Sequence, residues 1–98
     1  IHNMIFEWDD HKEQINIAKH GIDFKTAARV FQDEFRIEIF DELHSDIEER
    51  YITIGQIGGV EIVIMVVYTE RKQAIRLISA RKATAQERKM YHDCSSGN

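Results

Sequence analysis

The stretch ERYITIGQIGGVEIVIMVVYTERKQAIRLISA, residues 49–80, decides the fold of this chain. It contains three runs rich in apolar and β-branched residues, at 49–57, 60–69 and 73–80, which are separated by Gly58-Gly59 and by the polar residues 70–72. Such runs with short turn signals between them predict consecutive antiparallel strands. In the middle run, the residues that would point to either face of a sheet are apolar. We therefore expect a central strand that is covered on both faces.

The segment before these strands is mainly helical. Residues 5–8 predict a short first strand, and Asp10 with Glu13 indicates a capping box that opens a helix reaching His20. Gly21 follows where a helix exit in left-handed geometry favours glycine. Asp23 is expected to cap a second helix. The apolar positions of that helix have helical spacing and predict a core-facing stripe: Phe24, Ala27, Ala28 and Phe31.

The remaining elements complete an α+β fold. Residues 36–41 alternate as a strand, a polar loop follows at 42–46, and a second capping box opens a final helix that runs to about His92. That box consists of Thr84 and Glu87. We therefore predict an antiparallel sheet packed with two N-terminal helices and one C-terminal helix. The expected division is a single domain at residues 4–92, an added segment at 1–3 and a flexible tail at 93–98.

Charge is distributed unevenly along the chain. The protein has 98 residues, 43% of them hydrophobic, and a net charge of −4, yet residues 71–98 alone carry +5 and residues 1–70 carry −9. This local excess of arginine and lysine can attract an anion such as a phosphate backbone, although solvated surface charge explains it equally well. No apolar run approaches the ~20 residues that span a membrane. The lone cysteine, Cys94, fits a reducing cytoplasm, where we expect the protein to act.

The sequence gives little indication of a metal site or of a catalytic nucleophile. The five histidines form no HxxxH or HxH pair, and one cysteine offers no thiolate cluster, so we predict neither a metal nor a cofactor. Gly58-Gly59 reads as a hairpin turn and does not resemble a phosphate loop. Ser45 beside His44 is a polar loop pair, and Cys94 lies near the end of the chain, where activation is not expected.

The basic residues of the C-terminal part form the stronger constellation. Arg76 interrupts the otherwise apolar run 75–78, so its guanidinium needs an anionic partner. An internal carboxylate such as Glu49 or Glu61 would satisfy it, and so would a phosphate that accepts two hydrogen bonds. Both readings stay open. Arg81 closes the same strand, and Arg88 is either a surface residue or a further member of one cleft.

Two acid–base candidates lie elsewhere in the sequence. His20 ends the first helix, where a histidine interacts favourably with the helix C-terminus, and histidine can also transfer protons near neutral pH. In residues 48–51, alternation places Glu49 with Tyr51 on one face and Glu48 with Arg50 on the other. The sequence leaves open which of these faces meets a cleft.

Several runs in this order and spacing resemble the BrnT toxin family of bacterial type II toxin–antitoxin systems, over nearly all of residues 4–91. The runs that carry the resemblance are Phe6-Glu7-Trp8-Asp9, Lys19-His20-Gly21-Ile22-Asp23-Phe24, His44-Ser45, Glu48-Glu49-Arg50, Ile54-Gly55, Tyr68-Thr69-Glu70-Arg71, Ile78-Ser79-Ala80-Arg81-Lys82-Ala83-Thr84, Glu87-Arg88 and Tyr91. The resemblance implies a RelE-like fold, a ribonuclease activity that stops translation, and neutralisation by a BrnA-type antitoxin that binds DNA.

The resemblance also implies a metal-independent reaction in which the RNA 2′-hydroxyl attacks the adjacent phosphate. Such a reaction requires a base, a cation for the developing charge and an acid for the leaving oxygen. We assign charge stabilisation to Arg76 and Arg81, with Arg50 as a third member, and proton transfer to His20 or Glu49. The expected substrate-binding residues are Lys19, Arg88 and Tyr91.

The expected partners are RNA and the cognate antitoxin, with operator DNA reached only through the antitoxin and no contact with a membrane. An open sheet edge also offers a surface for a homodimer. The alternative function is a non-catalytic module that docks an acidic or DNA-binding protein. A third option is an enzyme fold that retains only autoregulation of transcription together with its antitoxin.

Overall fold

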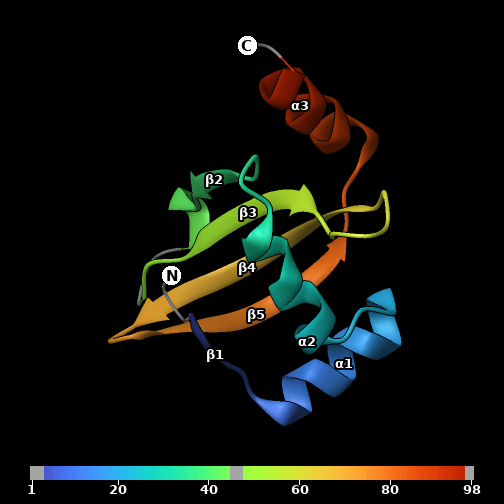
Figure 1. Ribbon diagram of the computed structural model, residues 1–98. Helices are drawn as coiled ribbons and strands as arrows, with labels where there is room; N and C mark the ends of the chain where they lie inside the picture. The colour runs from blue at the N-terminus through green and yellow to red at the C-terminus, as the bar shows by residue number, and fades with distance from the viewer. Residues whose placement is uncertain (1–3, 45–47, 97–98) are drawn as a thin grey trace.

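The computed structural model describes residues 4–44 and 48–96 and confirms the α+β architecture, in agreement with the RelE-like fold that the resemblance implies (Figure 1). The expected added segment at residues 1–3 lies outside the described residues. The elements, in chain order, are β1 Ile5–Glu7, α1 Asp10–His20, α2 Phe24–Ala27, the 3-10 helix η1 Ala28–Gln32, β2 Ile37–Phe40, the 3-10 helix η2 Glu42–His44, β3 Tyr51–Gln56, β4 Val63–Arg71, β5 Ala74–Lys82 and α3 Ala85–Ser96.

The five strands form one sheet with the order β1-β5-β4-β3-β2. Strands β2 to β5 pair antiparallel as predicted, and β4 is central, with seven of its nine residues buried or half-buried. Strand β1 departs from the prediction because it pairs parallel with β5, from Ile5 opposite Ala74 to Glu7 opposite Arg76. No tight turn joins these two strands, so no hairpin dictates their relative direction. The sheet is therefore mixed.

A β-bulge in β5 changes which side chains share a face. Val67 of β4 pairs with Ser79, but the next residue, Tyr68, pairs with Leu77, so Ile78 has no partner of its own. One extra residue reverses the alternation of side chains beyond it. Leu77 and Ala80 consequently belong to the same buried cluster although they are three residues apart.

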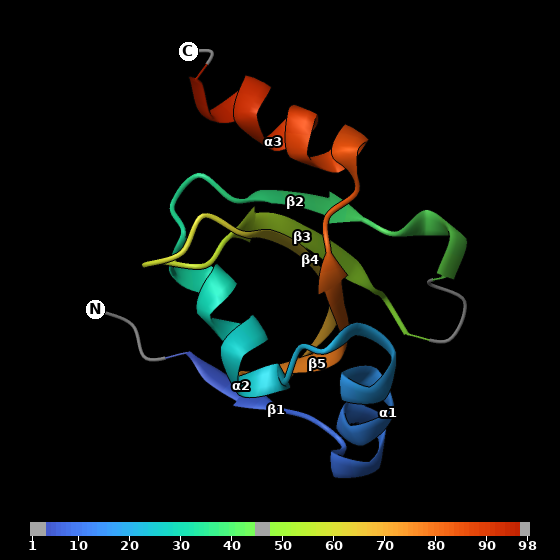
Figure 2. The ribbon, with the colours of Figure 1, turned by 90° about the vertical axis from the view of Figure 1, so that its right-hand side faces the viewer.

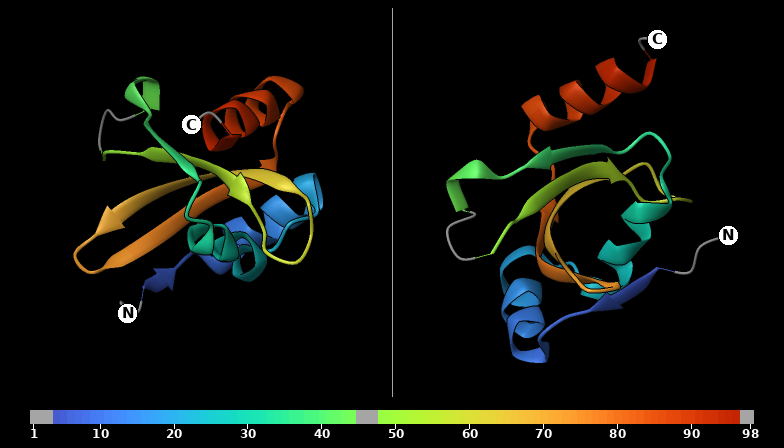
Figure 3. Two further views of the ribbon diagram at one scale, coloured as in Figure 1. Left: turned by 45° about the horizontal axis from the view of Figure 1, so that its top comes forward. Right: turned by 90° about the vertical axis from the view of Figure 1, so that its left-hand side faces the viewer.

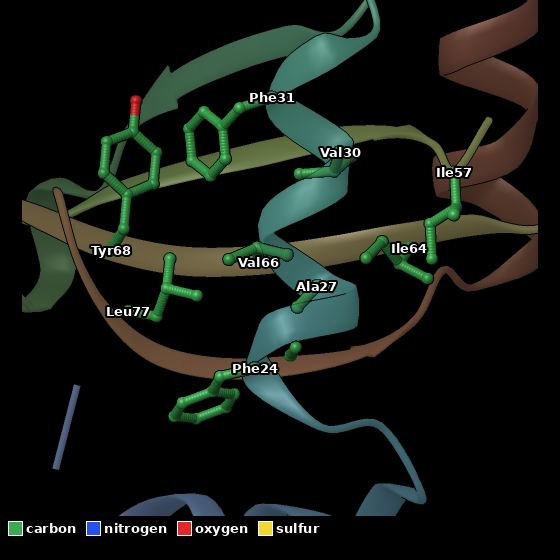
Figure 4. Packing of buried hydrophobic residues seen from close by; sticks show 10 residues of the cluster. Phe24, Ala27, Val30, Phe31, Ile57, Ile64, Val66, Tyr68 and Leu77 are labelled. Atoms are coloured by element: carbon green, nitrogen blue, oxygen red, sulfur yellow. The ribbon is translucent and has the colours of Figure 1, made fainter. Parts of the chain in front are cut away.

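The first core lies between the sheet and the α2–η1 segment (Figure 4). The N-cap Asp23 accepts a hydrogen bond from the Thr26 N–H, as predicted, and the chain then turns through α2 into η1. Phe24, Ala27, Val30 and Phe31 point from this segment onto β4 and β5, where Ile64, Val66 and Leu77 receive them. Burying one such apolar side chain contributes roughly 1.5–3 kcal/mol, so this stripe is a main source of stability.

The second core lies on the other face of the sheet, beneath α3. It contains Ile54, Val63, Met65, Ala83 and Tyr91. Figures 2 and 3 show the sheet curling around α2 and η1, with α3 outside the curl. The capping box at the start of α3 is confirmed, since Glu87 N–H donates to Thr84 Oγ1 and Thr84 N–H donates to Glu87 Oε1. Helix α3 continues to Ser96, beyond the predicted end at His92.

Helix α1 takes the place of a strand at the edge of β5. Its Asn16 is buried, and the side-chain amide both donates to the Ala80 carbonyl, at 2.9 Å, and accepts from the Ala80 N–H, at 3.0 Å. Asn16 Nδ2 also donates to the Ile22 carbonyl. Strand β1 reaches only the level of Arg76, so this amide satisfies backbone groups of β5 that β1 leaves unpaired.

The capping of α1 differs from the prediction. The N-cap is Asp9, whose side chain accepts from the Lys12 N–H, and the predicted box of Asp10 and Glu13 does not form. Glu13 instead accepts from the Phe24 N–H, at 2.9 Å, and so ties α1 to the start of α2. The αL exit at Gly21 is confirmed by its φ of 73°.

We expect Asn16→Ala to lower the free energy of unfolding by about 3 kcal/mol, because it leaves a buried N–H and carbonyl of β5 without partners. Urea denaturation at neutral pH measures the change. The control is Gln14→Ala, which removes an exposed amide from the same helix and should cost under about 0.5 kcal/mol. Equal losses in the two variants would contradict the role assigned to Asn16.

Candidate active site

The bulge at Ile78 brings arginines of β5 to one face of the sheet. Arg76 lies opposite Thr69, and Arg81 lies opposite Met65, which belongs to the core beneath α3. The two arginines lie five positions apart, so regular alternation would have placed them on opposite faces. The bulge adds one residue to β5 and so shifts the alternation of its side chains. Both arginines therefore point to the α3 side of the sheet, which we call the arginine face.

Two further arginines join the arginine face by alternation. Arg71 follows Thr69 by two residues on β4, and Arg50, immediately before β3, precedes Ile52 by two residues. Ile52 packs against the core beneath α3, which fixes the side to which Arg50 belongs. The sequence did not single out Arg71, although its spacing from Thr69 carried the information.

Each of three arginines on this face is paired with a carboxylate. Arg76 Nη1 lies 3.1 Å from Glu7 Oε2, and Arg71 Nε lies 2.8 Å from Glu48 Oε2. Arg81 Nη1 lies 2.9 Å from Glu87 Oε1. Glu7 was not considered as the partner of Arg76, for which the sequence offered Glu49 or Glu61. It was missed because strand β1 pairs with β5 from 69 residues away.

The arginines lower the pKa values of two of these carboxylates. The hydrogen bond from Arg71 lowers the pKa of Glu48 below its ordinary value, with further lowering by the charges of Arg71, Arg50 and Arg76. Likewise the hydrogen bond from Arg81 lowers the pKa of Glu87. Both acids therefore remain ionised under conditions in which an isolated glutamate begins to protonate.

Glu49 lies on the opposite face from these groups. Its Oε1 accepts a hydrogen bond from the Tyr51 hydroxyl, and Tyr51 packs against the core beneath α2 and η1. The alternation drawn from the sequence, Glu48 with Arg50 and Glu49 with Tyr51, agrees with this arrangement. Of the neighbouring acids Glu48 and Glu49, it is therefore Glu48 that lies beside the arginines.

His20 and Lys19 are exposed at the C-terminal end of α1. His20 follows Asn16 by one helical turn, so both lie on the same side of α1. Because Asn16 binds Ala80, this side of the helix lies along the C-terminal half of β5, the part that carries Arg81. Within residues 4–44 and 48–96, neither side chain forms a hydrogen bond with the arginine face.

Tyr91, a residue of α3, is buried between this helix and the sheet, with 4% exposure. Its hydroxyl donates to Asp33 Oδ2 at 2.6 Å, and burial together with this bond raises the pKa of Tyr91 to about 12. Tyr91 therefore joins α3 to the η1–β2 loop, and its contact with RNA stays a prediction. Arg88, also on α3, is exposed and donates to the Ala83 carbonyl.

Asp33 gathers several donors around one carboxylate. Its Oδ2 also accepts from the Gln56 N–H and its Oδ1 from the Phe35 N–H. Partial burial raises the pKa of this carboxyl, but the hydrogen bonds, led by that from Tyr91, bring it below its ordinary value. Gly55 permits the close approach, since a Cβ there would lie 2.8 Å from Val30 Cγ2 and 3.2 Å from Asp33 Oδ2.

Two hollows lie away from the predicted site residues. One, of about 530 Å³, is bounded by Gln32, Asp33, Gln56 and the β3–β4 turn at residues 57–61. Another, of about 420 Å³, lies between Phe6, Trp8, Ala28 and the cations Lys25 and Arg29.

In the described part of the chain no group of three or more His, Cys, Asp or Glu side chains is arranged around a metal position. No helix among these residues is long and apolar enough to cross a membrane.

Comparison with known proteins identifies a family. A family model described as the ribonuclease toxin BrnT of type II toxin–antitoxin systems matches residues 8–87. This range includes every predicted catalytic residue, and of the predicted substrate-binding residues it includes Lys19. No curated protein matches the chain.

We expect Tyr91→Phe to lower the free energy of unfolding at pH 7 by about 1.5 kcal/mol, since it removes a hydrogen bond to a carboxylate. The folded-state pKa of Asp33 is depressed, so its stabilisation is present above the unfolded value of about 3.9 and is lost as the pH falls through the folded value. The cost of Tyr91→Phe should therefore shrink between pH 7 and pH 3 in urea unfolding. Tyr51→Phe, which removes a more exposed hydroxyl, is the control. A cost that does not change with pH would exclude Asp33 as the group responsible.

Proposed function

The chain belongs to the BrnT family of ribonuclease toxins of type II toxin–antitoxin systems, and we propose that it cleaves RNA without a metal ion on the arginine face, thereby stopping translation. The observation that carries this assignment is the bulge at Ile78, which turns Arg76 and Arg81 toward the same side of the sheet. Without it, the two strongest candidates for binding phosphate would lie on opposite faces.

The proposed reaction is an internal displacement at phosphorus. A base removes the proton from the RNA 2′-hydroxyl, and the 2′ oxygen then bonds to the adjacent phosphorus. The bond from phosphorus to the 5′ oxygen breaks, and an acid supplies the proton that this oxygen needs. The products are a 2′,3′-cyclic phosphate and a 5′-hydroxyl. The protein must stabilise negative charge on the phosphoryl oxygens and transfer two protons.

The spacing of the arginines suggests a division of roles. At about 3.3 Å per residue, the five positions from Arg76 to Arg81 place their Cα atoms at most about 16 Å apart along β5. We therefore assign Arg81 to the phosphate that reacts, and Arg76 to a neighbouring phosphate of the same strand. Arg50 belongs to the same face by alternation, and its charge helps to lower the pKa of Glu48, so we assign it to the same basic track.

His20 is the better placed of the two candidates for proton transfer. It projects from the side of α1 that runs along the C-terminal half of β5, whereas Glu49 bonds to Tyr51 on the far face. Lys19 lies on α1 beside β5, and Arg88 lies on α3, which follows β5 in the chain. Both cations are exposed, and we assign them to positioning of the RNA backbone.

A type II toxin implies a cognate protein antitoxin. We propose that this antitoxin is of the DNA-binding BrnA type, so that the toxin reaches operator DNA only through it. One observation favours the alternative of a non-catalytic docking module, since each of Arg71, Arg76 and Arg81 already has a carboxylate partner. Measurement of RNA cleavage by the protein freed from its antitoxin separates the two functions.

The purified protein should cleave RNA in the presence of EDTA, and Arg81→Ala should lower the rate on the order of 10²-fold, because one charge-stabilising donor is lost. Cleavage of a fluorescent oligoribonucleotide measures this. Arg29→Ala is the matched control, since Arg29 is exposed and donates to Gly58 at the far side of the molecule. Intact RNA in EDTA, with tight binding of the antitoxin, would support the docking module instead.

His20→Gln should lower kcat for the same oligonucleotide by about 10²-fold, because proton transfer typically contributes 10²–10⁴-fold. It should also weaken growth arrest and mRNA decay when the toxin is expressed from a tightly controlled promoter. Glu49→Gln tests the other candidate in parallel. If Glu49→Gln causes the larger loss while His20→Gln retains activity, the assignment of the proton carrier is reversed.

A further inference from the structure

The hydrogen bonds of Arg81 occupy only part of its guanidinium. Nη1 donates to Glu87 Oε1, at 2.9 Å, and to the Lys82 carbonyl, at 3.1 Å. Nη2 donates to Glu87 Oε2 at 3.0 Å. A guanidinium carries five N–H donors, so the Nε–H and the second N–H of Nη2 remain. Within the described residues neither has an acceptor, and these two donors point in the same direction along one edge of the planar group.

Glu87 is held as firmly as the arginine that it contacts. It is the third residue of α3 and closes the capping box that Thr84 opens, and its Oε1 accepts from the Thr84 N–H at 2.9 Å. Its own N–H donates to Thr84 Oγ1 at 3.1 Å. The side chain of Glu87 is 20% exposed, against 32% for Arg81, so the carboxylate lies deeper than the cation. The first turn of α3 thus fixes the carboxylate, and the carboxylate fixes the guanidinium plane.

We propose that Glu87 is the positioning residue for Arg81, holding its guanidinium end-on so that the Nε and Nη2 edge is presented as a two-donor fork to the reacting phosphate of RNA. This inference rests on the proposed function and names the residue that prepares the site. Two parallel N–H donors match two phosphoryl oxygens, which gives orientation as well as charge. Fixing these donors in advance reduces the rotamer entropy lost when RNA binds.

The other two ion pairs on the arginine face lack this combination. Glu48 binds Arg71 through Nε and Nη2, so it occupies the edge that a phosphate would need. Glu7 contacts Arg76 through Nη1 alone, at 3.1 Å, which leaves the guanidinium free to rotate about that bond. Of these three arginines, Arg81 alone has both a fixed plane and an open edge.

Glu87→Gln tests the proposal while preserving the cap. The glutamine Oε1 can still accept from Thr84 N–H and from Arg81 Nη1, but its amide nitrogen faces Arg81 Nη2 and cannot accept. We expect kcat for RNA cleavage to fall about 10- to 100-fold with a smaller change in KM, since the donors are misplaced in the transition state. In an Arg81→Ala background, the same substitution should have no further effect on kcat.

Thr84→Ala is the matched control. It removes the other half of the capping box and so weakens the start of α3, but it leaves both bonds between Glu87 and Arg81 in place. Its kcat should stay within about twofold of the parent, although a lost cap typically costs about 1 kcal/mol of stability. Equal losses of kcat in Thr84→Ala and Glu87→Gln would reduce Glu87 to a helix cap and overturn the proposal.

A readout that does not depend on cleavage separates this proposal from the proposed function. In ¹⁵N-labelled protein, titration with an all-2′-deoxy oligonucleotide, which cannot be cut, should shift the Nε–H resonance of Arg81. In Glu87→Gln that shift should be lost. If the parent fails to cut RNA but shows the shift, the ribonuclease assignment falls and the phosphate fork stands. If the parent cuts RNA and Glu87→Gln keeps both the shift and kcat, the fork proposal alone is wrong.

Discussion

The pairing of the Asn16 amide with the backbone of Ala80 is the interaction on which the rest of the structure depends. A single side chain donates to and accepts from one residue of β5, as a neighbouring strand would, and it also donates to the α1–α2 connection at Ile22. It thereby orders the edge of β5 beyond the reach of β1, places α1 there, and supports the start of α2. The apolar stripe of α2 and η1 can then cover the concave face of the sheet.

The contacts that order β5 also determine which side chains form the candidate site. The bulge at Ile78 lies between the level where β1 ends, at Arg76, and the level where Asn16 binds, at Ala80. Side chains before and after the bulge therefore share a face, which is how Arg76 and Arg81 come to the same side. The final helix begins immediately beyond β5, and its capping residue Glu87 returns to Arg81. Fold and site are consequently built from the same few contacts.

The proposed site brings arginines together on one face of the sheet, although the protein as a whole is acidic and carboxylates lie beside these arginines. The net charge is −4, yet four arginines gather on one face, and at least three of them lie against carboxylates. These carboxylates reduce the long-range attraction for RNA and at the same time reduce the freedom of the guanidinium groups. For the proposed RNA site, this arrangement favours pre-organised short-range hydrogen bonds over a strong overall electrostatic field.

The sequence by itself determined the features that depend on neighbouring residues. The exit of α1 at Gly21, the cap of α2 at Asp23, the box of Thr84 and Glu87, and the central strand β4 all follow from signals a few positions apart. The family motifs also lie in the sequence itself, and they indicated a ribonuclease toxin. Alternation at residues 48–51 also separated Glu49 from Arg50, although it did not show which face mattered.

Tertiary structure alone decided the features that depend on pairing between distant segments. The parallel direction of β1, the bulge at Ile78, the partner of Arg76 and the pairing of Asn16 with Ala80 join residues that lie 64 or more positions apart, or depend on the register of two strands. Local pattern carries no information on such registers, because many pairings satisfy the same alternation of apolar and polar residues. Their choice is made by packing and by the need of buried backbone groups for partners.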